Sequence, residues 1–190
     1  MVLLGVLALA ACTSGDAEGG EVTAPPSPPA TSQTLTAQPT DEPTATGEAV
    51  APPEMPAEAR EQTAAGATAF ASFWFEAVEH AYASGDSSML SDLAGSSCTA
   101  CDYVIDSIAE LNADGHRAVG VSFDLRGAAA PPPDDRGTIV SMGLVESASH
   151  VVDASGEVVE ESAETDLVPI TVYVQAVEDE WRIFDIGVVE

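Results

Sequence analysis

The sequence contains no lysine, and five arginines are its only strongly basic residues, against 32 acidic ones. The formal net charge at pH 7 is therefore −27. Nucleic-acid binding needs a cationic surface that displaces counterions, so this charge argues against a nucleic-acid partner. It also argues against electrostatic adhesion to anionic lipid, which leaves hydrophobic or covalent attachment as the routes to a membrane.

The apolar run at the N-terminus, residues 2–11, is too short to span a bilayer. It ends in Leu9-Ala10-Ala11-Cys12 and is followed by polar residues. Small residues before a cleavage point are typical of a secretory signal peptide, which also needs a cationic segment at its start. No Lys or Arg precedes the run, so we expect the natural start to lie upstream of Met1.

The Leu-Ala-Ala-Cys sequence resembles the lipobox of bacterial lipoproteins. The resemblance implies that residues 1–11 are a lipoprotein signal peptide, and that the Cys12 thiol receives a diacylglyceryl group and becomes the new N-terminus. It also implies an extracytoplasmic protein, anchored by lipid to the outer face of the cytoplasmic membrane. The alternative is an ordinary buried cysteine at position 12.

Residues 12–55 form a tether rich in Pro and Thr, without a basic or an aromatic residue. Such a segment cannot bury enough apolar area to offset its chain entropy, so we expect it to be disordered. Its prolines favour extended polyproline II conformations at about 3.1 Å per residue. We expect the tether to hold a folded domain, residues 56–190, away from the bilayer.

The folded domain is predicted to begin with helices and to continue with strands. Apolar residues recur at helical spacing from Phe70 to Tyr82, a short second helix follows Gly85, and a third runs from Thr99 to Asn112. After Gly115 the period changes to two, which is typical of half-buried strands. We therefore predict an α+β fold, with three N-terminal helices packed on one curved, cone-like antiparallel sheet of four to five strands.

The helical region also resembles a known group of proteins. Its motifs are Phe73-Trp74, Ala81-Tyr82-Ala83, Gly85-Asp86 and Cys98-Thr99-Ala100-Cys101. They resemble an uncharacterised actinobacterial lipoprotein family over residues 54–112. More loosely, three helices followed by a curved sheet are similar to the fold of nuclear transport factor two and the SnoaL-type cyclases, which hosts many functions.

Cys98-x-x-Cys101 is the sharpest local motif. In an oxidising extracytoplasmic space this pair is predicted to form a structural disulfide, which leaves Cys12 for the lipid. Thiol–disulfide exchange is an alternative, because such a motif at a helix N-terminus lowers a thiol pKa. Metal binding is a weaker alternative, since no second Cys pair or paired His supplies further ligands.

No nucleophile motif, phosphate loop or calcium loop is present, and we predict no catalytic residues, cofactor or metal site. Phe70, Trp74 and Tyr82 are candidate pocket-lining residues, although aromatics at helical spacing also suit a plain core. The leading hypothesis is a non-enzymatic module that binds a cell-wall component or an envelope protein. The alternatives are a small-molecule or SnoaL-like isomerase or hydrolase site inside the cone and, as a minor one, thiol exchange.

Overall fold

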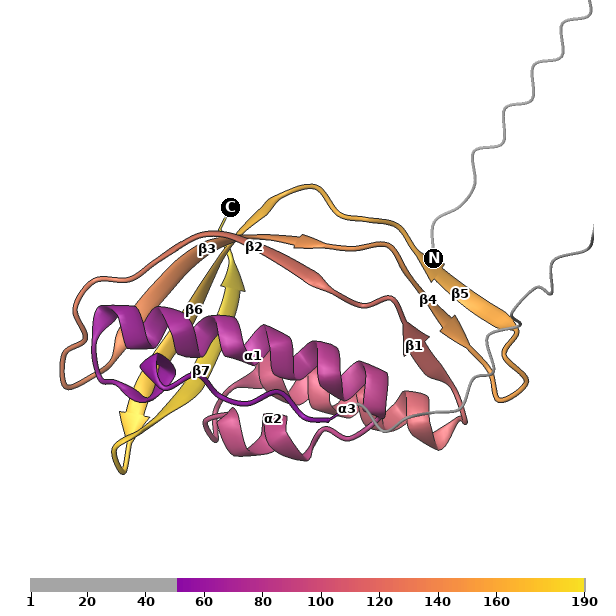
Figure 1. The fold of residues 1–190 in the computed structure, drawn as a ribbon, viewed down its shortest axis with the longest axis horizontal. Coiled ribbons are helices and arrows are strands. Elements are labelled where there is room, and N and C mark those ends of the chain that lie inside the picture. The colour runs from indigo at the N-terminus through magenta and orange to yellow at the C-terminus, as the bar shows by residue number, and fades with distance from the viewer. Residues whose placement is uncertain (1–50, 190) are drawn as a thin grey trace, which may run out of the picture. The chain divides into compact units, whose positions relative to one another are not determined.

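The structure is a computed structural model that describes residues 51–189. The predicted signal peptide, the lipidation site Cys12 and the tether up to residue 50 lie outside the described residues. All statements below concern residues 51–189, whose ribbon is shown in Figure 1.

A short 3₁₀ helix, η1 (Glu58–Arg60), precedes the long helix α1 (Ala64–Ser84). The hydroxyl of Thr63 accepts a hydrogen bond from the Gly66 N–H at 3.0 Å and caps the start of α1. Gly85, with a φ of 78°, ends the helix and donates its N–H to the Ala81 carbonyl. The predicted aromatic stripe therefore lies on one helix.

The helices α2 (Ser88–Leu93) and α3 (Thr99–Ala113) follow. The Asp86 carboxylate accepts from the Ser88 N–H at 2.9 Å, one residue before the N-cap position of α2. Hydrogen bonds from the Ser88 N–H and then its hydroxyl lower the pKa of Asp86. The third helix ends at Ala113, one residue beyond the predicted Asn112.

Seven strands follow the helices: β1 (Arg117–Val119), β2 (Phe123–Ala129), β3 (Thr138–Glu146), β4 (Ser149–Val152), β5 (Val158–Ser162), β6 (Val168–Val177) and β7 (Glu180–Val188). They form two antiparallel sheets, one of three strands in the order β1-β4-β5 and one of four in the order β2-β3-β6-β7. In Figure 1 the smaller sheet lies toward the C-terminal end of α1.

The prediction of three helices on a single sheet of four to five strands is therefore wrong. The sequence pattern predicts continuous strands over residues 119–126 and 138–152, but the structure divides the first at residues 120–122 and the second at Ser147-Ala148. At the first break Gly120 has a φ of 83°, which a regular strand does not adopt. Both breaks are tied together, because the Ser122 and Ser147 hydroxyls lie 2.7 Å apart and the Ser147 N–H donates to the Ser122 carbonyl.

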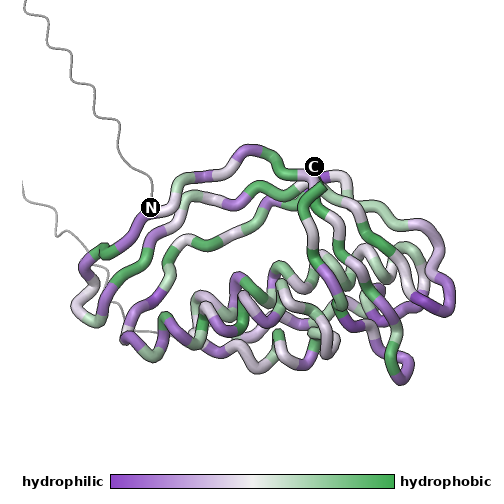
Figure 2. The backbone as a smooth tube through the Cα atoms, turned by 180° about the vertical axis from the view of Figure 1, so that it is seen from behind, coloured by the Kyte–Doolittle hydropathy of each residue, from purple (hydrophilic) through white to green (hydrophobic). Residues whose placement is uncertain are grey.

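The core lies between the helices and the four-stranded sheet. Phe70, Trp74, Leu90 and Ile108 from the helices, and Ile183 from β7, are among its largest fully buried side chains. The charged turn at residues 178–179 between β6 and β7 is hydrophilic (Figure 2). No helix within residues 51–189 is long and apolar enough to cross a membrane.

Candidate functional site: an acidic cleft

A cleft of about 520 Å³ opens between the helices α1 and α3 and the smaller sheet β1-β4-β5. We call it the α1–α3 cleft. Its polar lining comprises Tyr82, Tyr103, Ser107, Glu110, Asp114, His116, Glu146, Ser149, Glu160 and Ser162. The cleft therefore collects side chains from segments that lie far apart in the sequence.

Regular secondary structure aligns these side chains. On α3 the cleft residues Tyr103, Ser107 and Glu110 recur every three to four positions, which places them on one helix face. On β5 the cleft residues Glu160 and Ser162 are two positions apart, so both point to the same side of the sheet. The helix and the strand thus present polar faces to the same space.

The charge of the cleft has one sign. Four carboxylates line it, from Glu110, Asp114, Glu146 and Glu160, and its lining contains neither Arg nor Lys. Carboxylates gathered in a concave surface focus a negative potential and attract positively charged groups. The cleft is thus chemically suited to a cationic group of a ligand.

Tyr82 lies near the C-terminal end of α1 and lines the cleft together with Ala118 of β1. Burial raises the pKa of the Tyr82 hydroxyl, and the negative charge of Glu146 and the nearby Tyr103 raise it further. The hydroxyl therefore keeps its proton at physiological pH and remains a hydrogen-bond donor. Tyr103 is 74% exposed, so its ring face is open to a cation above it.

A neighbouring hollow of about 300 Å³ shares Tyr82 with the cleft and is also lined by Glu79 and Arg117. The Glu79 carboxylate accepts a hydrogen bond from the Phe123 N–H at 2.6 Å. It satisfies a backbone donor at the first residue of β2, next to the break between the two sheets. Glu79 therefore positions the sheet and is not a free ligand-binding group.

Comparison with known families places the chain. A family of unknown function, DUF6318, matches residues 40–186. The chain belongs to this family. The expected resemblance to an uncharacterised family is confirmed at that level, and it extends well beyond the helical region that suggested it. An actinobacterial lipoprotein and a likeness to nuclear transport factor two do not follow from the DUF6318 match.

No curated protein matches this DUF6318 chain. Among solved structures, the crystal structure of the intermembrane space region of the chloroplast protein ARC6 is similar, with 15% sequence identity and a TM-score of 0.49. The match covers 72% of this chain and 98% of that chain. A likeness of this size indicates no function for the DUF6318 chain.

The three predicted pocket residues do not meet in one pocket. Tyr82 lines the α1–α3 cleft, whereas Phe70 borders a separate pocket of about 470 Å³ beside Trp181. Trp74 is 1% exposed and belongs to the hydrophobic core. Helical spacing correctly predicts that these side chains share one helix. Because α1 is long, Phe70 and Tyr82 lie toward different ends of it, and Trp74 lies in the core between them.

The pocket beside Trp181 is a weaker candidate site. Arg60 and Arg182 line it together with three acidic residues, so its charge is mixed. Arg182 is already paired with Glu180 at 2.9 Å, and it also donates to the Trp181 carbonyl. Its positive charge is therefore partly neutralised within the DUF6318 chain itself.

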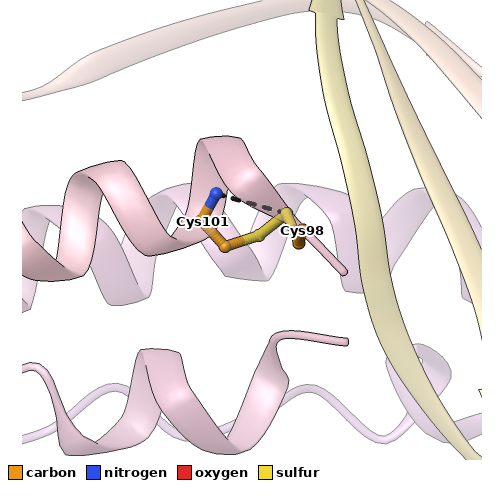
Figure 3. Close-up of a disulfide and its surroundings, with 2 residues drawn as sticks. All are labelled: Cys98 and Cys101. Atoms are coloured by element: carbon orange, nitrogen blue, oxygen red, sulfur yellow. Dashed lines mark hydrogen bonds between the residues drawn. A yellow bond between two sulfur atoms is a disulfide. The ribbon is translucent and has the colours of Figure 1, made fainter. Parts of the chain in front are cut away.

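Cys98 and Cys101 form a disulfide, as predicted (Figure 3). Both residues are 0% exposed, and Cys98 Sγ accepts a hydrogen bond from the Cys101 N–H at 3.2 Å at the start of α3. Thiol exchange needs an accessible sulfur, so this burial disfavours the redox alternative. Residues 51–189 contain no cluster of three or more His, Cys, Asp or Glu that could hold a metal ion.

The three histidines lie in different places. His116 lines the cleft, while His150 lies on β4 opposite Glu161 of β5. His80 lies on α1, and no described residue forms a hydrogen bond with its buried Nδ1. Among residues 51–189 the ion pairs all involve arginine, and none joins His116 to a carboxylate. The cleft therefore shows no general acid–base pair in this geometry.

The cleft carboxylates Glu110, Asp114, Glu146 and Glu160 were not predicted as site residues. They lie on a helix, at its end and on two strands, and no short motif connects them. The only sequence signal was the excess of acidic residues over the whole chain. Their convergence depends on how the smaller sheet is turned toward α3, which the hydrophobic pattern does not encode.

Proposed function

We propose that this chain is a lipid-anchored, extracytoplasmic binding module that takes a positively charged ligand from the cell envelope into its α1–α3 cleft. The observation that carries the proposal is a concave site with four carboxylates and no arginine or lysine in its lining. Tyr82 adds a protonated hydroxyl, and Tyr103 adds an exposed aromatic face. In this proposal these groups recognise the ligand by its charge and shape, and they catalyse no reaction.

The anchor rests on the sequence. The lipobox-like Leu9-Ala10-Ala11-Cys12 follows an apolar run, and the Pro-rich tether separates Cys12 from the folded residues. The paired Cys98 and Cys101 leave Cys12 as the remaining cysteine. A net charge of −27 gives no electrostatic affinity for anionic lipid, so attachment requires the acyl chains.

Binding of hexa-arginine to the full chain carrying Cys12→Ser tests the cleft. The triple variant Glu110→Gln, Glu146→Gln and Glu160→Gln removes three charges while keeping the side-chain shapes. We expect it to bind hexa-arginine about tenfold more weakly, because three lost pairs of ~0.5 kcal/mol each sum to about 1.5 kcal/mol. Isothermal titration calorimetry at low ionic strength measures the dissociation constants.

A matched control separates the cleft from the general negative charge. The variant Glu58→Gln, Glu76→Gln and Asp135→Asn removes the same charge from exposed positions that do not line the cleft. We expect it to bind within about twofold of the parent chain. Equal weakening by both triple variants would mean that the charge attracts cations without a site, and the binding proposal would fail.

The anchor is tested separately, by intact-mass analysis of the chain expressed in a bacterium from its natural start. We expect a mass increase of diacylglyceryl size on Cys12 and recovery of the protein in the membrane fraction. Cys12→Ser should release it from the membrane. If Cys12→Ser stayed in the membrane fraction, the lipid anchor would be excluded.

A further inference from the structure

The strand β5 is an exposed edge of the smaller sheet. It pairs with β4 on one side and ends the strand order β1-β4-β5. In the larger sheet β7 pairs with β6, and within residues 51–189 β4 is the only strand paired with β5. All five residues of β5 are exposed, and alternate backbone N–H and C=O groups of such an edge point away from the sheet.

The side chains around this edge combine apolar surface with one sign of charge. Val158 and Val159 are 46% and 50% exposed. The segment 157–166 carries Glu157, Glu160, Glu161, Glu164 and Asp166 and has no basic residue. Charged side chains protect an edge strand from unwanted pairing. Two exposed valines do not add to this protection, so the edge is not built only to prevent pairing.

The geometry points to β5 as the docking edge for an extended basic segment of an envelope protein, which pairs as an additional strand and directs alternate Arg or Lys side chains into the α1–α3 cleft. This inference rests on the proposed function and names the partner and its mode of binding. Main-chain hydrogen bonds to β5 provide affinity, and side chains at every second position provide specificity. Glu160 connects the two, because it lies on β5 and lines the cleft.

Charge complementarity decides between the possible occupants. The chain's own residues 13–50 contain no Lys or Arg, so they have no cation to offer the cleft. A second copy added edge to edge would bring Glu160 and Glu161 of both copies close together, and like charges on paired strands are destabilising. A basic strand from a different protein meets neither obstacle.

Two N-methylated isomers of acetyl-(Arg-Val)₃-amide test the strand mode on the full chain carrying Cys12→Ser. One isomer carries methyl groups on the three Arg nitrogens, and the other carries them on the three Val nitrogens. Both have the same charge and composition, but the methyl groups block opposite edges of the extended peptide. If the peptide adds to β5, it pairs through one of its two edges only. The isomer with that edge blocked should bind weakly, so we expect the dissociation constants of the isomers to differ at least tenfold.

The outcomes separate this inference from the proposed function. Isomers that bind within twofold of each other would overturn strand addition, while hexa-arginine binding sensitive to the cleft variant would leave the proposed function standing. A peptide that does not bind, alongside hexa-arginine that does, also overturns the strand mode.

Hydrogen exchange then locates the contact. Protection confined to β5 supports docking at the β5 edge, and protection at β2 or β7 contradicts it. A dimer through β5, detected by sedimentation, would replace the basic partner with a second copy.

Discussion

Single residues define the junction between η1 and α1. Gly66 packs against the backbone of the preceding segment, where an added Cβ would collide with the Glu61 carbonyl oxygen and lie 2.8 Å from that of Glu58. The Glu61 carbonyl also accepts the indole N–H of Trp181 at 3.0 Å. One glycine therefore allows a close approach that connects the start of α1 to the strand β7.

We predict that Gly66→Ala lowers the free energy of unfolding by about 1–3 kcal/mol, the usual cost of forcing atoms into a packed site. Helix propensity alone predicts the opposite sign, a gain of up to ~1 kcal/mol for Gly to Ala in a helix. Urea denaturation followed by tryptophan fluorescence measures the difference. The control Ala65→Gly, at an exposed neighbouring position, reports the propensity term alone. A stabilised Gly66→Ala variant would show that the junction yields without cost.

Among the elements, the sequence predicts the helices well and the division of the sheet poorly. The stripe from Phe70 to Tyr82 has a clear helical period, and local caps mark the ends of α1. The strand breaks depend on distant partners instead. At Ser147-Ala148 no Gly or Pro marks the break, and the hydrogen bonds that accompany it join Ser147 to Ser122, 25 residues away. A periodic pattern reports which residues are buried, but not where a strand changes sheet.

The same limit applies to the candidate site. Tyr82 was predicted because it belongs to the helical stripe, and it does line the cleft. Glu146 and Glu160 each follow two apolar residues in stretches predicted as strands, and nothing in the sequence marks them as neighbours in space. Only the placement of the smaller sheet opposite α3 turns these positions toward a shared space, so they required the tertiary structure.

The disulfide joins the end of the loop between α2 and α3 to the first turn of α3, and its burial makes a prediction about its reactivity. A reductant must reach a sulfur atom, and both cysteines are 0% exposed, so reduction should require opening of the structure. We predict that the Cys98–Cys101 bond survives dithiothreitol under native conditions and is reduced rapidly in 6 M urea. Maleimide trapping with mass spectrometry counts the free thiols. Rapid reduction in the folded state would instead favour thiol–disulfide exchange.

The variant Cys98→Ala/Cys101→Ala should fold with a loss in the free energy of unfolding below ~3 kcal/mol, because the closed loop is short.

At the scale of the whole molecule, the excess of negative charge opposes folding, and in the proposed function it attracts the cationic ligand. The ion pairs of residues 51–189 join residues only two positions apart: Asp124 with Arg126, Asp134 with Arg136, and Glu180 with Arg182. Such local pairs do not hold distant parts of the fold together, and exposed pairs contribute little. The long-range electrostatic balance is therefore repulsion among carboxylates.

Salt should consequently affect stability and binding in opposite directions. Between 10 mM and 0.3 M NaCl the screening length falls from about 30 Å to below 10 Å, which weakens repulsion among the carboxylates. We predict a rise in the free energy of unfolding on the order of 1 kcal/mol, the sum of a few like-charge pairs of ~0.2–0.5 kcal/mol each. Hexa-arginine binding should weaken over the same range, because screening also reduces its attraction to the cleft. Sodium perchlorate at equal ionic strength is the control, since screening does not depend on the anion. If salt lowered the free energy of unfolding as well as weakening binding, attractive ion pairs would dominate the electrostatics of the fold. Those pairs would have to join residues farther apart than the local pairs named above.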